Sequence, residues 1–99
     1  MDVEQQGNLI ASLRKSKTRR NVLEYLIDIR PKRSYPSEIS RSIKIQSTDV
    51  CGALKGVPKR FKEENSLTAL GLVEKIENEG KLLYRATPLG CKTWWALNE

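Results

Sequence analysis

Lysine and arginine are concentrated between residues 14 and 60 of this sequence, and their side chains are suited to holding a polyanion. This segment contains thirteen basic and four acidic residues, whereas residues 1–13 and 61–99 are each slightly acidic. Each phosphate group that a basic side chain neutralises releases a bound counterion, which favours association. A surface that only keeps the chain soluble would have the same composition, so charge alone leaves both interpretations open.

The sequence offers little for catalysis or metal binding. It contains no histidine, no phosphate-cradling glycine loop and no nucleophile elbow, so we expect no catalytic residues and no enzyme activity. Cys51 and Cys91 stand forty positions apart, whereas a closed zinc site needs four ligands. We therefore expect no metal and no cofactor, with both cysteines as small, partly buried thiols. Metal or redox sensing is the less favoured alternative.

The length predicts a single domain comprising residues 1–99, of which residues 1–7 are polar and expected to be flexible. No apolar run approaches the ~20 residues that cross a bilayer, and the polar N-terminus does not look like a signal peptide. With few cysteines and no disulfide framework, a reduced cytoplasmic protein without membrane contact is expected.

A hairpin is the clearest structural signal. Two apolar-rich runs, 72–77 and 81–86, are separated by Asn78-Glu79-Gly80, a short turn segment that contains glycine. Thr87 is placed to cap a following helix, with Pro88 in its first turn. The C-terminal part of the chain therefore predicts two strands and then a helix.

Short helices are predicted before the hairpin. Ser16 is expected to cap a helix whose apolar residues follow the 3.6-residue period, and Pro31 ends it. Residues 33–35 fit a short edge strand, and Pro36 opens a compact helix that ends near residue 43.

A turn at residues 44–46 leads to a further helix, with Ser47 as its expected N-cap. Two short helices joined by about three residues form a helix-turn-helix unit. In the segment that follows, residues 56–65, Pro58 is expected to kink or end the helix.

Four blocks follow one another over most of residues 16–90: SKTRRNVLEYL, YPSEISRSI, STDVCGALKG and LGLVEKIENEGKLLYRATPLG. In these blocks the chain resembles small prokaryotic transcription regulators of the ArsR/MarR type, particularly the minimal archaeal ones. The resemblance implies an α+β, mainly α, winged helix-turn-helix with a three-helix core, a β-hairpin wing and a C-terminal helix. The chain departs from the family in residues 56–65, which look like an insertion, and in Glu77 and Glu79, where basic residues are more usual.

The resemblance implies a transcription regulator that binds double-stranded DNA, with a recognition helix at about residues 47–56 in the major groove. The candidates for base contacts are Gln46, Ser47, Thr48, Cys51, Gly52 and Lys55. For Ser47, helix capping alone is the simpler interpretation. No arginine occurs in residues 46–56, which indicates modest direct readout of the bases.

Phosphate contacts require only charge and position. The candidates are Arg19, Arg20, Ser37, Arg41, Lys59, Arg60, Lys75 and Lys81, with Lys55 as a further one. Each of them is equally well explained as a solvated surface residue. Because Glu77 and Glu79 repel phosphates, the wing is expected to contribute less than the recognition helix.

Trp94 and Trp95 lie about 100° apart on the last helix, so one surface of a monomer cannot easily bury both. We expect one to cover the core and the other to contact a partner chain in a homodimer. The alternative is that both pack on their own domain.

A winged-helix module that binds protein or RNA, without reading DNA sequence, is the rival function. The acidic wing tip favours this rival, whereas the basic first helices favour DNA.

Overall fold

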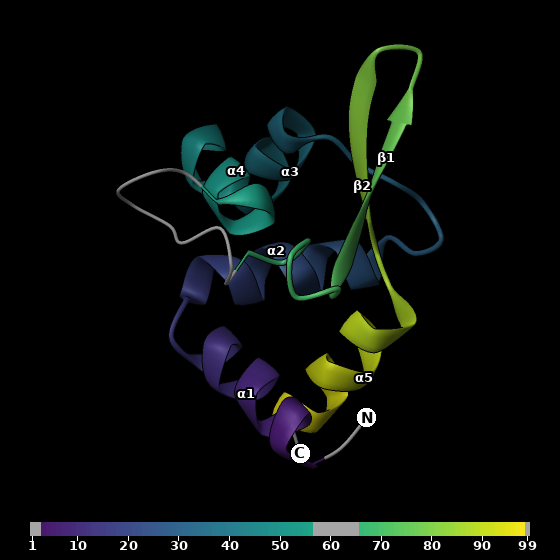
Figure 1. Cartoon of the computed structure of the whole chain (residues 1–99). Coiled ribbons are helices and arrows are strands. Elements are labelled where there is room, and N and C mark those ends of the chain that lie inside the picture. Colours follow the sequence, from purple (N-terminus) through teal and green to yellow (C-terminus); the bar gives the residue numbers. More distant parts are fainter. Residues whose placement is uncertain (1–2, 57–65, 99) are drawn as a thin grey trace.

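The computed structural model describes residues 3–56 and 66–98. Its elements in chain order are α1 (Val3–Arg14), α2 (Lys17–Asp28), α3 (Pro36–Ile43), α4 (Ser47–Lys55), β1 (Val73–Asn78), β2 (Lys81–Ala86) and α5 (Pro88–Leu97) (Figure 1). The fold is therefore small, α+β and mainly helical, with one two-stranded antiparallel hairpin among the described residues. None of these helices is long and apolar enough to cross a membrane.

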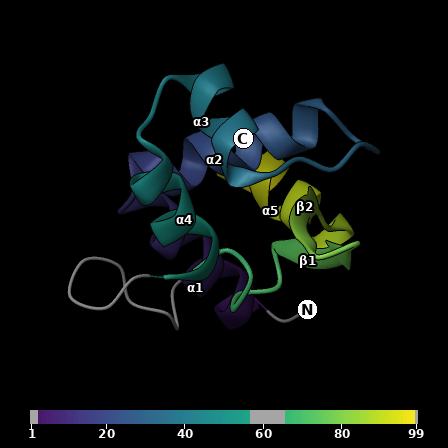
Figure 2. The same ribbon diagram turned by 90° about the horizontal axis from the view of Figure 1, so that it is seen from above.

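Helix α2 crosses the middle of the molecule and separates two groups of elements (Figure 1). Helices α3 and α4 and the hairpin lie on one side of α2, which we call the upper half. Helices α1 and α5 pack against each other on the opposite side, the lower half. Seen from above, α4 and the hairpin lie on opposite sides of the upper half (Figure 2).

The core is centred on α2. Its residues Val22, Leu23 and Leu26 have no exposed surface, and they belong to the same buried cluster as Ile39 of α3 and Leu54 of α4. These α2 residues are members of the stripe that the 3.6-residue period predicts. Burying each apolar side chain of this size contributes about 1.5–3 kcal/mol, so the packing of α3 and α4 on α2 holds the upper half in place.

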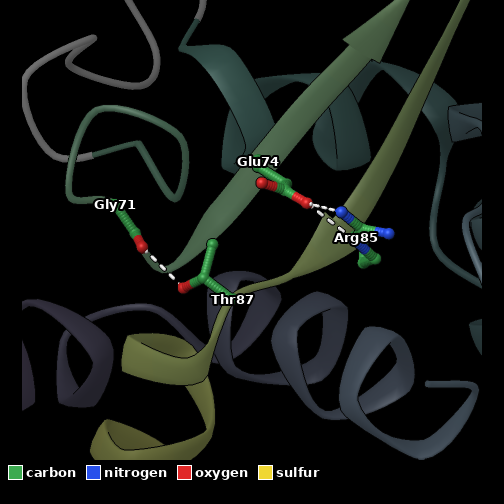
Figure 3. Close-up of polar contacts among 4 residues, drawn as sticks. All are labelled: Gly71, Glu74, Arg85 and Thr87. Atoms are coloured by element: carbon green, nitrogen blue, oxygen red, sulfur yellow. Dashed lines mark hydrogen bonds and ion pairs between the residues drawn. The ribbon is translucent and has the colours of Figure 1, made fainter. Parts of the chain in front are cut away.

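Two predicted helix caps are confirmed. The Ser16 hydroxyl accepts the backbone N–H of Arg19 at 3.2 Å. The Thr87 hydroxyl accepts the N–H of Gly90 at 3.0 Å and also donates to the carbonyl oxygen of Gly71 at 2.7 Å (Figure 3). Thr87 thus fixes the start of α5 to the chain that enters the hairpin.

The predicted short edge strand is present as a single bridge. The Ser34 N–H donates to the Tyr84 carbonyl oxygen at 3.0 Å, and the Tyr84 N–H donates back to Ser34 at 2.7 Å. Pro36 then begins α3, as predicted. The bridge joins the segment before α3 to the middle of β2, so it positions the hairpin relative to the helix pair.

The structure differs from the prediction at the beginning of two helices. Residues 3–7, expected to be flexible, form the beginning of α1, because glutamate and glutamine favour helix and the later residues Leu9 and Leu13 are buried against the core. The N-cap of α4 is Gln46 and not Ser47, which is already helical, and Gln46 makes no side-chain capping bond. Such one-residue differences at helix ends are common.

The hairpin has a tighter turn than its sequence suggests. Asn78 pairs with Lys81, so the loop consists of Glu79 and Gly80 alone. Both have positive φ, 53° and 79°, as a type I′ turn requires. The strand β1 consequently begins at Val73 and ends at Asn78, one residue later than the predicted run at 72–77.

Candidate nucleic-acid interface

The turn between α3 and α4 is closed by local hydrogen bonds. Lys44 ends α3 in the left-handed conformation, with φ of 58°. The Ser40 hydroxyl donates to the carbonyl oxygen of Ile45, and the Ile45 N–H donates to that of Ser40 at 3.2 Å. These bonds satisfy groups at the end of α3 and set the direction in which α4 begins.

The first residues of α4 present polar side chains to solvent. Gln46, Ser47 and Thr48 are exposed, whereas Val50 and Leu54 are fully buried. Because the apolar side of α4 faces the core, its N-terminal polar residues form an outward surface on the upper half. Hydroxyl and amide groups of this kind can donate to and accept from the edges of nucleic-acid bases.

Two candidates on α4 are not part of that outward surface. Gly52 is buried, and this burial does not favour the predicted contact with bases. Without a side chain it has little surface of its own, and the packing of α4 covers it. Cys51 is half-buried beside Tyr84, and the pKa of that tyrosine is raised mainly by burial and further by Cys51. Lys55, the last residue of α4, is exposed.

Two candidate phosphate contacts are buried or hydrogen-bonded within the fold. Arg19 is only 8% exposed, and burial lowers the pKa of its guanidinium group. Arg20 donates from Nη1 to the carbonyl oxygens of Leu13, at 2.9 Å, and of Arg14, at 2.7 Å. These carbonyls belong to the end of α1 and have no partner within the helix. Arg20 therefore caps α1, and these bonds do not favour the predicted phosphate contact.

The other described candidates are accessible on the upper half. Ser37 and Arg41 are exposed on α3, and the Arg41 Nη2 donates to the Tyr35 hydroxyl at 3.4 Å. Lys75 and Lys81 are exposed on the hairpin. Lys59, Arg60 and the expected kink at Pro58 lie outside the described residues.

Lys17 and Lys44 are basic residues that were not among the predicted phosphate contacts. Both line a groove of about 600 Å³ between the start of α2 and the turn before α4, together with Gln46. The groove brings two ammonium groups to the side of the outward surface of α4. Both had a sequence signal: Lys44 lies in the turn immediately before α4, and Lys17 lies in the first turn of α2, where the helix dipole disfavours a positive charge.

The tip of the hairpin is acidic and partly apolar. Glu77 and Glu79 are both exposed, and Leu82, the cross-strand neighbour of Glu77, is 38% exposed. Lys75 and Lys81 offset the two carboxylates. The tip therefore has almost no net charge, unlike the basic surface around α3 and α4.

The two tryptophans have different surroundings. Trp94 is half-buried and packs against the core, whereas Trp95 is 64% exposed. Trp95 lies on α5 and so in the lower half, away from α3, α4 and the hairpin (Figure 1).

Both cysteines are free thiols, with Cys91 buried. In the two described segments, no three Cys, Asp, Glu or His side chains are grouped as the ligands of a metal ion would be.

Comparisons with known proteins give a family and a relative. A family model described as EarA-like matches residues 9–96. An uncharacterized protein of Methanocaldococcus jannaschii is 42% identical over 84 residues, which is 85% of this chain and 76% of the relative. No solved structure matches the chain.

Proposed function

We propose that this chain, which belongs to the EarA-like family, is a winged helix-turn-helix protein of the ArsR/MarR type that binds double-stranded DNA and regulates transcription. Helices α3 and α4 are the helix-turn-helix and the hairpin is the wing. The observation that carries the proposal is the exposed polar start of α4, with basic side chains on the elements around it.

In this proposal the N-terminal end of α4 enters the major groove. Gln46 pairs with adenine, while Ser47 and Thr48 contact base edges of several kinds. Arg41 and Lys44 contact phosphates on one flank of α4, and Lys55 does so at its other end. Arg19, Arg20 and Gly52 have no part in the interface, because they are buried or occupied in the fold.

The test is binding to double-stranded DNA of mixed sequence, measured by fluorescence anisotropy over a range of salt concentrations. If the exposed basic residues contact phosphates, the logarithm of the association constant falls with the logarithm of salt concentration at a slope of roughly −3 to −5. An affinity that barely changes between low and moderate salt contradicts the proposal.

A protein- or RNA-binding module is the second candidate, and the hairpin tip is the observation that favours it. Glu77, Glu79 and the half-exposed Leu82 fit a protein surface better than a phosphate backbone. Single-stranded RNA as a competitor separates the two functions. RNA that displaces the duplex, or the absence of duplex binding at low salt, supports this second candidate.

We also propose that the protein acts as a homodimer, because the exposed Trp95 lies on the half of the molecule opposite α4. Contacts made there leave both copies of α4 accessible.

A further inference from the structure

A cavity of about 350 Å³ lies where the base of the hairpin meets the helices. Its walls come from the chain after α2, from both strands and from the first residue of α5. The lining residues are Arg30, Pro31, Glu74, Arg85, Ala86 and Pro88. The volume is at the lower end of the range for small-molecule sites, and none of these residues belongs to the proposed DNA interface.

The described lining residues carry two guanidinium groups and one carboxylate. Arg85 donates from Nε to Glu74 Oε1 at 2.6 Å and from Nη2 to the same oxygen, while its remaining nitrogen points away from Glu74 (Figure 3). Glu74 thus compensates the charge of Arg85 through two of the guanidinium nitrogens. The third nitrogen of Arg85 is a further hydrogen-bond donor.

Arg30 is held differently. Its Nη1 contacts Sγ of Cys91 at 2.6 Å. Arg30 is otherwise exposed, and because a thiol is a weak acceptor, this contact does not compensate the guanidinium charge in the way that a carboxylate does. The described lining residues of the cavity therefore carry a net positive charge.

The remaining walls are apolar and stiff. Pro31 and Pro88 have ring-restricted backbones, and Ala86 is buried. An anion with a compact apolar body can place that body against these residues and its oxygen atoms against the arginines.

We propose that this cavity binds a small organic anion, whose carboxylate or phosphate oxygens accept hydrogen bonds from Arg30 and Arg85. A planar guanidinium group matches both kinds of oxyanion in a two-bond arrangement. Binding here is separate from DNA binding, so it can be tested on the protein alone.

The experiment is a titration of the ¹⁵N-labelled full chain followed by NMR. The probes are benzoate, phenyl phosphate and inorganic phosphate, each compared with sodium chloride at the same ionic strength. We expect saturable shifts of the backbone amides of Arg30, Glu74 and Arg85 with the organic anions. The tighter of benzoate and phenyl phosphate identifies the preferred oxyanion.

Two variants test the arginines against a matched control. Arg30→Gln and Arg85→Gln should each weaken binding about tenfold, as expected for a lost charge-assisted hydrogen bond. Arg33→Gln removes the same charge from an exposed residue of the same loop that does not line the cavity, and should leave the affinity unchanged.

Glu74→Gln provides a variant that gains binding. Removing the competing carboxylate frees Arg85, so the anion should bind roughly threefold to fivefold more tightly. Misfolding cannot produce this gain, and the NMR spectrum itself reports whether each variant is folded. The proposal is overturned if no probe gives saturable shifts, if Arg30→Gln and Arg33→Gln bind equally well, or if Glu74→Gln binds more weakly. Inorganic phosphate binding as tightly as phenyl phosphate would overturn the role of the apolar walls.

Discussion

Arg20 and Arg41 carry the same charge but have different surroundings. Arg20 bonds two carbonyl groups at the end of α1, whereas Arg41 is exposed on α3 beside the hydroxyl of Tyr35. We expect Arg20→Gln to lower the free energy of unfolding by about 1–2 kcal/mol, because charge-assisted hydrogen bonds are lost, and to leave the salt dependence of DNA binding unchanged.

Arg41→Gln should do the reverse. It should leave stability nearly unaltered and make the slope of log affinity against log salt shallower by about 0.9, the loss of one phosphate contact. Urea unfolding followed by circular dichroism and the DNA titration at several salt concentrations measure the two effects. Equal changes in slope for both variants would show that this division of roles is wrong.

Gly90 lies where α5 touches the backbone that enters the hairpin. A Cβ atom at this position would overlap the carbonyl oxygen of Leu72 and approach Leu23 Cδ1 to 3.3 Å. Because a backbone group cannot rotate out of the way, Gly90→Ala should destabilise the fold by about 1–3 kcal/mol.

Gly7→Ala is the matched control for this glycine. Gly7 lies in α1, and a Cβ atom there meets nothing within 4 Å. Alanine is the better helix former by about 1 kcal/mol, so this substitution should stabilise the protein slightly. Urea unfolding measures both variants, and a Gly90→Ala protein as stable as the wild type would contradict the close packing.

The caps at Ser16 and Thr87 could be predicted from single residues, but the contacts of the arginines could not. Ser16 and Thr87 bond backbone groups three residues away, so the local sequence contains all the necessary information. Arg20 bonds the preceding helix, and this depends on the angle between α1 and α2. The burial of Arg19 and Gly52 likewise depends on neighbours that are distant in sequence.

The turn of the hairpin contains Glu79, and a glutamate is unfavourable in the backbone conformation of this turn. Glu79 has a φ of 53°, which asparagine tolerates much better than glutamate. Glu79→Asn should therefore raise the free energy of unfolding by about 0.5–1 kcal/mol. Since it also removes a negative charge from the tip, it should tighten nonspecific DNA binding if the tip approaches phosphates.

Glu77→Gln separates the two effects. It removes the same charge from a strand residue, so it should tighten DNA binding to a similar extent without raising stability. Thermal unfolding and anisotropy titrations at low salt measure the two quantities. Unchanged DNA affinity in both variants would mean that the tip points away from the duplex, and unchanged stability of Glu79→Asn would contradict the strain at the turn.

Among the elements, those with punctuating residues were the most predictable. Pro36 marks the start of α3, and the glycine-containing segment at 78–80 marks the hairpin. The beginning of α1 at residues 3–7 was not predicted, because these residues lack an apolar pattern. Helix α1 packs against α5, a contact between the two ends of the chain that no local pattern contains.

The upper and lower halves of the molecule (Figure 1) present different kinds of side chain to solvent. The upper half presents the polar start of α4 and several basic side chains, and the lower half presents Trp95 on α5. The order of helices in the sequence is compatible with many arrangements, so this division could not be predicted before the elements were placed. It separates the surface proposed for a polyanion from the surface proposed for an apolar contact.

This separation predicts how two copies would assemble. Joined through α5, they keep both α4 helices accessible, because α5 lies in the lower half and α4 in the upper half. The wild-type chain should therefore sediment as a dimer at tens of micromolar. Trp95→Ser should raise the dissociation constant of the dimer by about thirtyfold, the effect of losing one central aromatic contact.

Lys92→Ser is the control for the dimer, since Lys92 is an exposed residue of the same helix and should change the dimer little. Trp94→Ser should lower stability instead, because Trp94 packs on the core. Sedimentation equilibrium measures the dissociation constants, and circular dichroism checks that each variant is folded. A wild-type chain that remains monomeric at these concentrations would rule out a strong dimer through Trp95, and α4 would then have to read a single half-site.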